Sequence, residues 1–245
     1  MGRGVDALVA RMREVLASLQ AARDPARFFL GTYLRTTVAV GAAIDDGRFE
    51  DPAWVTDCDV DFAELYLDAL AAHRRDPAAP ARPWRLAFGA RRDLAPEAHV
   101  LLGMNAHINF DLPQSLVRVI PPADFDDPAV RASRRRDHER IDGVLASRIA
   151  AEDAELHRDG GRRSPVDRVL SPANRTASQV FLRESRRKVW ANAGRLDTAR
   201  RRGPDAYARR IAELEAASAD RVADLLRPGP VLLQLAVRGF GVRLA

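Results

Sequence analysis

The residues best suited to chemistry lie in one short stretch, LLGMNAHINFDLPQ, over residues 101–114. Within this mostly apolar segment stand Asn105, His107, Asn109 and Asp111. A histidine titrates near neutral pH and can move a proton, a carboxylate can orient it, and amides can polarise a carbonyl group. The sequence therefore predicts a buried polar site with these four residues as its catalytic candidates.

Helical spacing brings the histidine and the acid together. On a helix of 3.6 residues per turn, His107 and Asp111 lie one turn apart on one face, and the two asparagines share a second face. Apolar residues fill most of the other positions, so we expect a central buried helix over about 96–112. Pro113 cannot donate a backbone hydrogen bond and crowds the preceding turn, so the helix should end or kink there.

Two other interpretations of this stretch stay open. The polar side chains could simply tie neighbouring helices together, because buried polar groups need partners. Alternatively, His107 and Asp111 could bind a single Fe, Mn or Zn ion, with Asp61 or Asp142 completing the ligand set. No other cofactor is expected. A multinuclear zinc site is disfavoured because the other histidines fall on stripes that we expect to be exposed, namely His73, His99, His138 and His157.

Other helices should supply the substrate-binding residues. Tyr66, Trp84 and Trp190 could line an apolar pocket. Arg186 lies within an apolar stripe and could pair with a buried carboxylate or extend outward to solvent. Asp61 shares a face with apolar residues, although it could also favour the dipole at the start of its helix.

Two further acids complete the substrate-binding candidates. Asp137 and Asp142 lie on a helix whose apolar positions face the core. The pattern places both acids on the solvated face of that helix, so their assignment to the site is the less direct one.

Helix-start and loop signals along the chain predict an all-α fold. Asp24-Pro25 and Asp51-Pro52 each combine an N-cap residue with a proline suited to the first helical turn. We find no alternating strand pattern, and internal loops are expected at 76–83 and 158–172. The chain is therefore predicted to be one helical domain over 1–245. Besides the central helix, the expected helices cover about 5–19, 26–44, 52–70, 84–88, 131–157, 173–201, 204–227 and 230–243.

The amino-acid composition limits which partners and which cellular location we expect for the chain. The chain has 245 residues, 47% of them hydrophobic, which is enough for a sizeable core. The net charge of +5 comes from arginines, with Lys188 the one lysine, and acids alternate with them, so no nucleic-acid partner is expected. Cys58 alone cannot form an intramolecular disulfide. No run is apolar enough for a signal peptide or a membrane span, and we expect a cytoplasmic protein.

The apolar C-terminal segment, residues 231–245, has three interpretations. It could pack back onto the helical bundle, which we favour. It could also form the contact of a homodimer, or lie on a membrane surface as an amphipathic helix.

The segments FEDPAWVTDCDVDFAELYLDAL, WRLAF and LLGMNAHINFDLP, followed by an Arg-x-x-x-Trp pair, resemble in this order a family of helical bacterial proteins of unknown function, frequent in actinobacteria. The resemblance covers roughly residues 30–200. Where the family pattern has Asp-Phe-x-x-x-Asn, this chain reads DHERID over 137–142, which puts an inherited role for that helix in doubt. The resemblance implies no reaction. It implies a shared pattern of Tyr66, Trp84, Asn105, His107, Asn109, Asp111, Asp137, Arg186 and Trp190.

Two classes of function follow from these residues. The first is a cofactor-independent enzyme of the lyase, isomerase or cyclase type that acts by acid/base chemistry on a small hydrophobic substrate, for instance in specialised biosynthesis. Isomerisation, cyclisation, dehydration and hydrolysis all fit, and a variant would use a metal held by His107 and Asp111. The second class is a ligand-binding or interaction protein without catalysis.

Overall fold

A computed structural model describes residues 3–158, 165–227, 239 and 241–244. For residues 146–182 within these ranges, only the backbone is described. All regular elements in these residues are helices, which confirms the predicted all-α single domain. The helices are α1 (Arg3–Ala21), α2 (Ala26–Asp45), α3 (Pro52–Arg75), α4 (Arg82–Phe88), α5 (Pro96–Ala106), the π-helical turn η1 (His107–Asp111), α6 (Leu112–Val119), α7 (Pro122–Asp126), α8 (Pro128–Arg158), α9 (Pro165–Arg201) and α10 (Pro204–Leu225).

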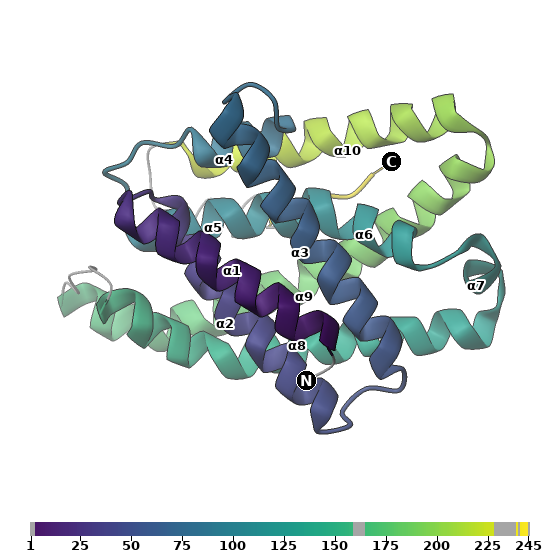
Figure 1. Ribbon diagram of the computed structural model, residues 1–245, viewed down its shortest axis with the longest axis horizontal. Coiled ribbons are helices and arrows are strands. Elements are labelled where there is room, and N and C mark those ends of the chain that lie inside the picture. The colour runs from purple at the N-terminus through teal and green to yellow at the C-terminus, as the bar shows by residue number, and fades with distance from the viewer. Residues whose placement is uncertain (1–2, 159–164, 228–238, 240, 245) are drawn as a thin grey trace.

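The central helix is the continuous run α5–η1–α6. Helices α2, α4 and α10 pack against α5, while α3 and α9 pack against α6. In Figure 1, α1 and α3 run diagonally in front of this run, and α10 lies along the upper edge. The stretch LLGMNAHINFDLPQ, with its four polar residues, therefore lies in the middle of the bundle, as predicted.

A π-helical turn, rather than a helix end, accommodates Pro113. The backbone N–H of Leu112 bonds to the carbonyl of His107, five residues earlier, and the chain continues as a helix to Val119. Because a proline has no N–H and crowds the carbonyl four residues back, widening the helix by one residue relieves the conflict. The helix that was expected to end or kink at this position therefore continues through a π-bulge. The bulge shifts the helical register of α6 relative to α5.

The predicted helix start at Asp51 is confirmed, whereas the start predicted at Asp24 is one residue early, because Pro25 is the N-cap and α2 begins at Ala26. Asp24 Oδ1 accepts from the N–H of Ala26 at 2.9 Å, and Asp51 Oδ1 accepts from the N–H of Trp54 at 2.9 Å. The loop expected at 158–172 is too long, because α9 already begins at Pro165. A proline is tolerated in the first helical turn, so Pro165 starts the helix rather than separating two elements.

The expected helix over 230–243 is wrong for residues 239 and 241–243, which are not helical. Residues 230–238 and 240 lie outside the described part. Val242 and Leu244 are buried in the core, so the end of this segment packs onto the bundle. Side-chain amides form hydrogen bonds with its backbone, which are described below, and these bonds replace those of a helix.

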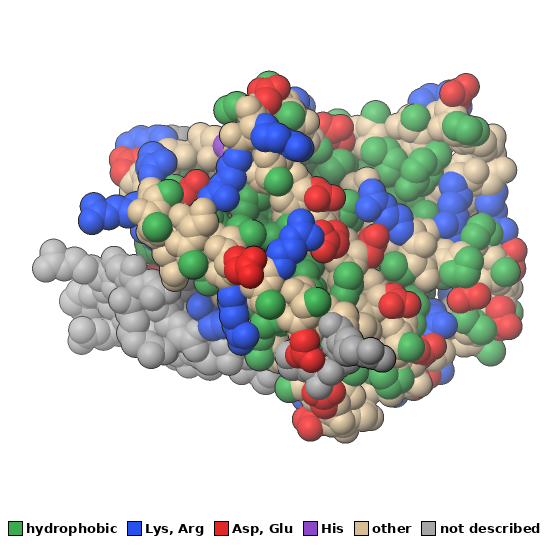
Figure 2. All heavy atoms as spheres, in the orientation of Figure 1, with side chains coloured by type: hydrophobic (Ala, Val, Ile, Leu, Met, Phe, Trp, Pro, Cys, Tyr) green, Lys and Arg blue, Asp and Glu red, His purple; other side chains and the backbone are tan. Residues whose placement is uncertain are grey.

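Charged side chains of both signs cover the surface. Figure 2 shows basic and acidic side chains intermingled over the visible face. Among the helices that the structure describes, none is long and apolar enough to cross a membrane.

Candidate functional site

His107, Asp111 and Trp84 form a buried hydrogen-bonded group at η1. His107 Nδ1 lies 2.8 Å from Asp111 Oδ2, and Trp84 Nε1 donates to the same oxygen at 2.9 Å. All three side chains are buried. Two N–H groups converging on one oxygen fit an ionised carboxylate, which assigns the Nδ1–H tautomer to His107. The lone pair of the imidazole is then on Nε2.

Five aromatic rings surround the imidazole of His107, and we call them the aromatic shell. The ring of Phe62 lies parallel to the imidazole with centroids 3.6 Å apart, and the ring of Tyr33 meets it edge-on at 4.7 Å. The shell consists of Phe29, Tyr33, Phe62, Tyr66 and Trp84. These contacts fix the orientation of the imidazole and keep bulk water away from it.

Burial governs the protonation of the pair. Desolvation lowers the pKa of His107 below its usual value, and its hydrogen bond to Asp111 only partly opposes this. Desolvation also raises the pKa of Asp111, against the hydrogen bonds from His107 and Trp84. Both shifts disfavour charge in this low-dielectric surrounding. His107 is therefore neutral at pH 7, and its Nε2 can accept a proton.

Three buried polar atoms of this region have no hydrogen-bond partner in the part of the chain that the structure describes. They are Nε2 of His107 and the hydroxyl groups of Tyr33 and Tyr66. A buried polar group without a partner costs free energy and is uncommon in native proteins. Nε2 of His107 and the Tyr33 hydroxyl could therefore each bind a polar ligand group or a water, whereas the Tyr66 hydroxyl belongs to a separate pocket described below.

Asp59 is a second acid beside this site, which sequence reasoning missed. Burial raises its pKa to about 7, and its Oδ2 has no hydrogen-bond partner among the described residues. Its charge also raises the pKa of Tyr33, after the larger effect of burial, so the Tyr33 hydroxyl stays protonated. The available signal was spacing, because Asp59 precedes Phe62 by one helical turn and Tyr33 follows Phe29 by one turn.

Asn109, a catalytic candidate from the sequence, forms hydrogen bonds with α9 and with the C-terminal segment. Its Oδ1 accepts from Ser185 Oγ at 2.9 Å and from the N–H of Val242 at 3.3 Å. Asn192 then donates to the carbonyl of Val242 at 3.1 Å and accepts from the N–H of Leu244 at 3.0 Å. These amides bind the C-terminal segment to the bundle. Asn105, the fourth catalytic candidate, is buried on α5.

Arg186 pairs with a carboxylate, as one sequence interpretation predicted, but between α8 and α9. It forms an ion pair with Asp142, and its guanidinium donates to the carbonyl of His138 at 2.5 Å. His138 Nε2 in turn lies 3.2 Å from the carbonyl of Arg186, and the His138 ring lies 5.5 Å from that of Trp190. His138 is buried, so the sequence-based expectation that it is exposed is wrong. The ion pair of Arg186 and Asp142 covers it. These bonds join two helices.

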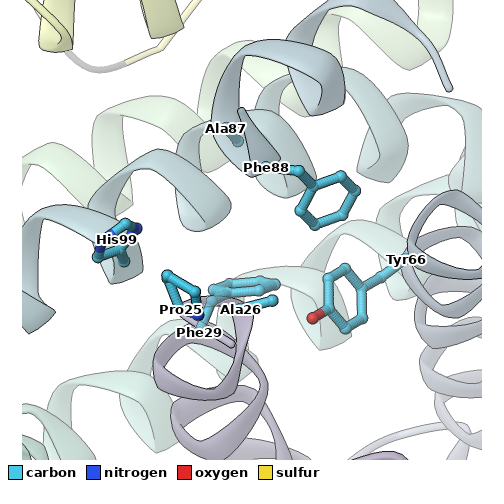
Figure 3. A pocket seen from close by; sticks show the side chains of 7 residues that line it. All are labelled: Pro25, Ala26, Phe29, Tyr66, Ala87, Phe88 and His99. Atoms are coloured by element: carbon cyan, nitrogen blue, oxygen red, sulfur yellow. The ribbon is translucent and has the colours of Figure 1, made fainter. Parts of the chain in front are cut away.

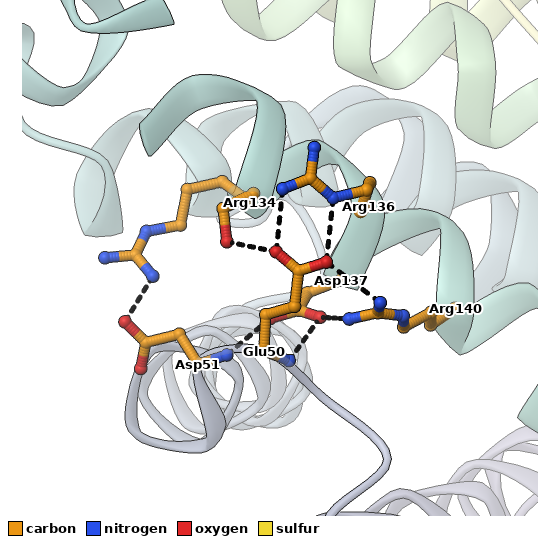
Figure 4. Close-up of polar contacts among 7 residues, drawn as sticks. Glu50, Asp51, Arg134, Arg136, Asp137 and Arg140 are labelled. Carbon is orange, nitrogen blue, oxygen red and sulfur yellow. Dashed lines mark hydrogen bonds and ion pairs between the residues drawn. The ribbon is translucent and has the colours of Figure 1, made fainter. Parts of the chain in front are cut away.

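Asp137 is also buried rather than solvated, which corrects the sequence-based expectation. Its carboxylate accepts from the backbone N–H groups of Glu50 and Asp51, each at 2.8 Å, and from Arg140 at 2.7 Å (Figure 4). Asp137 therefore satisfies the free donors ahead of α3 and holds the α2–α3 loop on α8. This is a positioning role for the fold.

Asp61 lies partly buried on α3, with its Oδ1 3.7 Å from an Arg118 nitrogen of α6. In the described part of the chain, no group of three or more His, Cys, Asp or Glu side chains is arranged to hold a metal ion. The predicted metal pair, His107 and Asp111, is hydrogen-bonded to itself, so only Nε2 of His107 would be open to an ion. Asp111 would then orient the imidazole through its hydrogen bond with Nδ1.

His99 likewise corrects the expectation that it is exposed. It is 6% exposed, and it lines a small pocket together with Phe29, Tyr66 and Phe88 (Figure 3). The pocket has a volume of about 20 Å³, which is room for about one water.

The fold and the site define a helical-bundle protein with a buried histidine–aspartate pair in its central helix. The chain belongs to a family of unknown function (DUF5995), whose model matches residues 5–228. The predicted resemblance to a family of unknown function is thereby confirmed. A comparison with curated proteins gives no match, and neither does a comparison with solved structures.

Proposed function

We propose that the protein is an enzyme that moves a proton on a small hydrophobic substrate, with Nε2 of His107 as the base. The observation that carries this proposal is the buried Nε2 on a ring that Asp111 orients, which has no hydrogen-bond partner among the residues that the structure describes. In a proton abstraction, Nε2 takes a proton from a carbon next to a carbonyl group, the C–H electron pair forms a carbon–carbon double bond, and the carbonyl π pair moves to the oxygen. Asp111 then stabilises the imidazolium.

The hydroxyl group of Tyr33, whose ring contacts the imidazole of His107, is suited to the negative charge that develops on the oxygen. Burial raises the pKa of Tyr33, so its hydroxyl remains a hydrogen-bond donor, and this hydroxyl has no partner among the described residues. Donors fixed in a dry site stabilise a developing oxyanion more strongly than water does. Return of the proton to another carbon or loss of a leaving group would give an isomerase or a lyase. Closure of a ring would give a cyclase.

The buried packing around His107 favours a second candidate, a binding protein that holds a small ligand without converting it. The imidazole is 2% exposed and stacked on Phe62, so a substrate reaches it only after side chains move. A metal-dependent enzyme with His107 as ligand, a homodimer, a cytoplasmic location and a role in biosynthesis also remain proposals from the sequence.

Deuterium exchange tests the acid/base proposal without knowledge of the full reaction. The protein is incubated in D₂O with small apolar ketones, aldehydes and esters, and deuterium incorporation is measured by mass spectrometry. We expect incorporation that is lost in His107→Gln and kept in His138→Gln, because His138 lies in the α8–α9 cluster. Equal incorporation by His107→Gln and the unchanged protein would reject His107 as the base.

A further inference from the structure

The pocket at His99 and the site at His107 lie on the same side of the central helix. His99, Gly103 and His107 follow one another at four-residue spacing, which places them along one stripe of α5 and the start of η1. Phe29 and Tyr66 line the pocket, and their rings also lie 5.8 and 5.9 Å from the imidazole of His107. The two histidines are therefore separated by a layer that these rings share.

Phe29 fills the space between the two histidines because Gly103 has no side chain. A Cβ built on Gly103 would lie 2.4 Å from Cγ of Phe29 and 2.7 Å from its Cδ2. Such distances are far below van der Waals contact, so the phenyl ring occupies the place where a side chain would lie. Moving this ring would open the pocket toward His107.

His99 gives the pocket a polar end. Its Nε2 is buried and has no hydrogen-bond partner among the residues that the structure describes. Its ring stacks on Phe28 with centroids 6.0 Å apart. In Figure 3, the hydroxyl end of Tyr66 points from the opposite side toward Phe29 and Ala26. The remaining walls are apolar, so the pocket combines aromatic faces with two polar groups that have no hydrogen-bond partner in the described part of the chain.

We propose that this pocket is the outer part of a ligand site for a planar aromatic molecule that carries one hydroxyl or N–H group. His99 Nε2 forms the hydrogen bond to that group, and Phe29 divides the pocket from His107 until the ligand displaces it. The closed pocket has room for about one water, so binding of a ring requires the phenyl group of Phe29 to move. This assignment rests on the proposed function only for what happens at His107, since binding at His99 needs no catalysis.

Phenol and toluene are the probes, because they have nearly the same shape and differ in the hydroxyl group. Their binding to the full chain is followed by NMR of isotope-labelled histidine side chains, with the His99 signal assigned from its absence in a variant. Hydrophobic transfer alone favours toluene. We expect phenol to bind about fivefold more tightly than toluene and to shift the His99 signal, as one hydrogen bond allows.

Variants of His99 test the hydrogen bond. His99→Leu keeps the bulk and removes the polar atom, so the preference for phenol should disappear. His99→Gln restores a polar group at a similar reach and should recover part of it. Equal preference for phenol in the unchanged protein and in His99→Leu would overturn the assignment, and so would the absence of any shift at His99.

Phe29→Leu tests the division between the two sites, and its melting curve checks that it folds. Phenol should then shift the signal of His107 as well as that of His99 and bind severalfold more tightly. Phenol that reaches only His99 in this variant would overturn the role of Phe29. Binding of phenol without deuterium exchange of the carbonyl substrates would support the pocket and reject the proposed catalysis. Deuterium exchange without binding of phenol would support the catalysis and reject the pocket.

Discussion

The ring of Phe29 lies so close to Gly103 that a Cβ on this glycine would come within 2.4 Å of the Phe29 Cγ atom. Phe29 belongs to α2 and Gly103 to α5. The glycine therefore sets how closely these two helices approach, and it holds one wall of the aromatic shell beside His107.

Gly103→Ala should destabilise the protein by about 1–3 kcal/mol, because the added methyl group overpacks the interface. For a chain of this size, each kcal/mol lowers the melting temperature by about 2–4 °C. Thermal unfolding followed by circular dichroism measures the change.

Gly194→Ala in α9 is the matched control, since a Cβ there meets nothing within 4 Å. This variant should be unchanged or more stable by about 0.5–1 kcal/mol, because alanine is the better helix former. Equal losses in the two variants would contradict the packing role of Gly103.

Asp59→Asn should remove part of the pH dependence of stability. Burial raises the pKa of Asp59 to about 7 in the folded protein, from an ordinary value of 3.8. The folded state therefore binds the proton more tightly than the unfolded state, so this contribution is complete below about pH 4. It is lost as the pH rises through about 7.

At pH 8, Asp59→Asn should accordingly be more stable than the unchanged protein by about 1–3 kcal/mol, because it buries no charge. At pH 4 the two proteins should be alike. Urea unfolding at both pH values gives the difference, and a constant difference between them would show that Asp59 titrates normally.

The fold was predictable from the sequence because helix starts and apolar stripes are local signals. Asp51 with Pro52 marks the start of α3 through one side-chain hydrogen bond and one missing N–H, and both lie within four residues. The π-helical turn was not predictable in the same way. It depends on how the helix resolves the clash at Pro113 while staying packed between α3 and α9, which is a tertiary matter.

The partners within the site were only partly predictable. The pair of His107 and Asp111 follows from helical spacing, whereas the Trp84 bond joins residues 27 positions apart. Tyr33 and Asp59 were missed because each looks ordinary within its own helix. Asn109 was given a catalytic role because its partners, Ser185 and Val242, are distant in sequence.

Asn192→Ala should loosen the C-terminal segment. Asn192 makes two hydrogen bonds to this segment, one to the carbonyl of Val242 and one from the N–H of Leu244. Removing the amide strands both backbone groups at about 1–3 kcal/mol each. Hydrogen exchange at the Leu244 amide should become at least tenfold faster. Thr198→Ala, an exposed change in the same helix, should leave this rate unaltered, and an unchanged rate in Asn192→Ala would contradict the anchoring role.

Asp111→Asn separates the chemistry of the site from its packing. The amide oxygen of asparagine can still accept from His107 and Trp84, which both bond to one oxygen of Asp111. The variant also buries no charge, so its melting temperature should stay within about 3 °C of the original or rise. Deuterium exchange should nevertheless fall by about a hundredfold or more, since the imidazolium loses its counter-ion.

Asp137→Asn is the control for Asp111→Asn, because it is also a buried acid in a helix. Both of its oxygens accept hydrogen bonds, from the N–H groups of Glu50 and Asp51 and from Arg140. An asparagine keeps only one oxygen, so at least one donor is stranded and stability should fall by about 1–3 kcal/mol. Exchange activity, measured below the lowered melting temperature, should remain. A large loss of stability in Asp111→Asn as well would make the His107–Asp111 pair part of the scaffold, since packing and not proton transfer would then account for its burial.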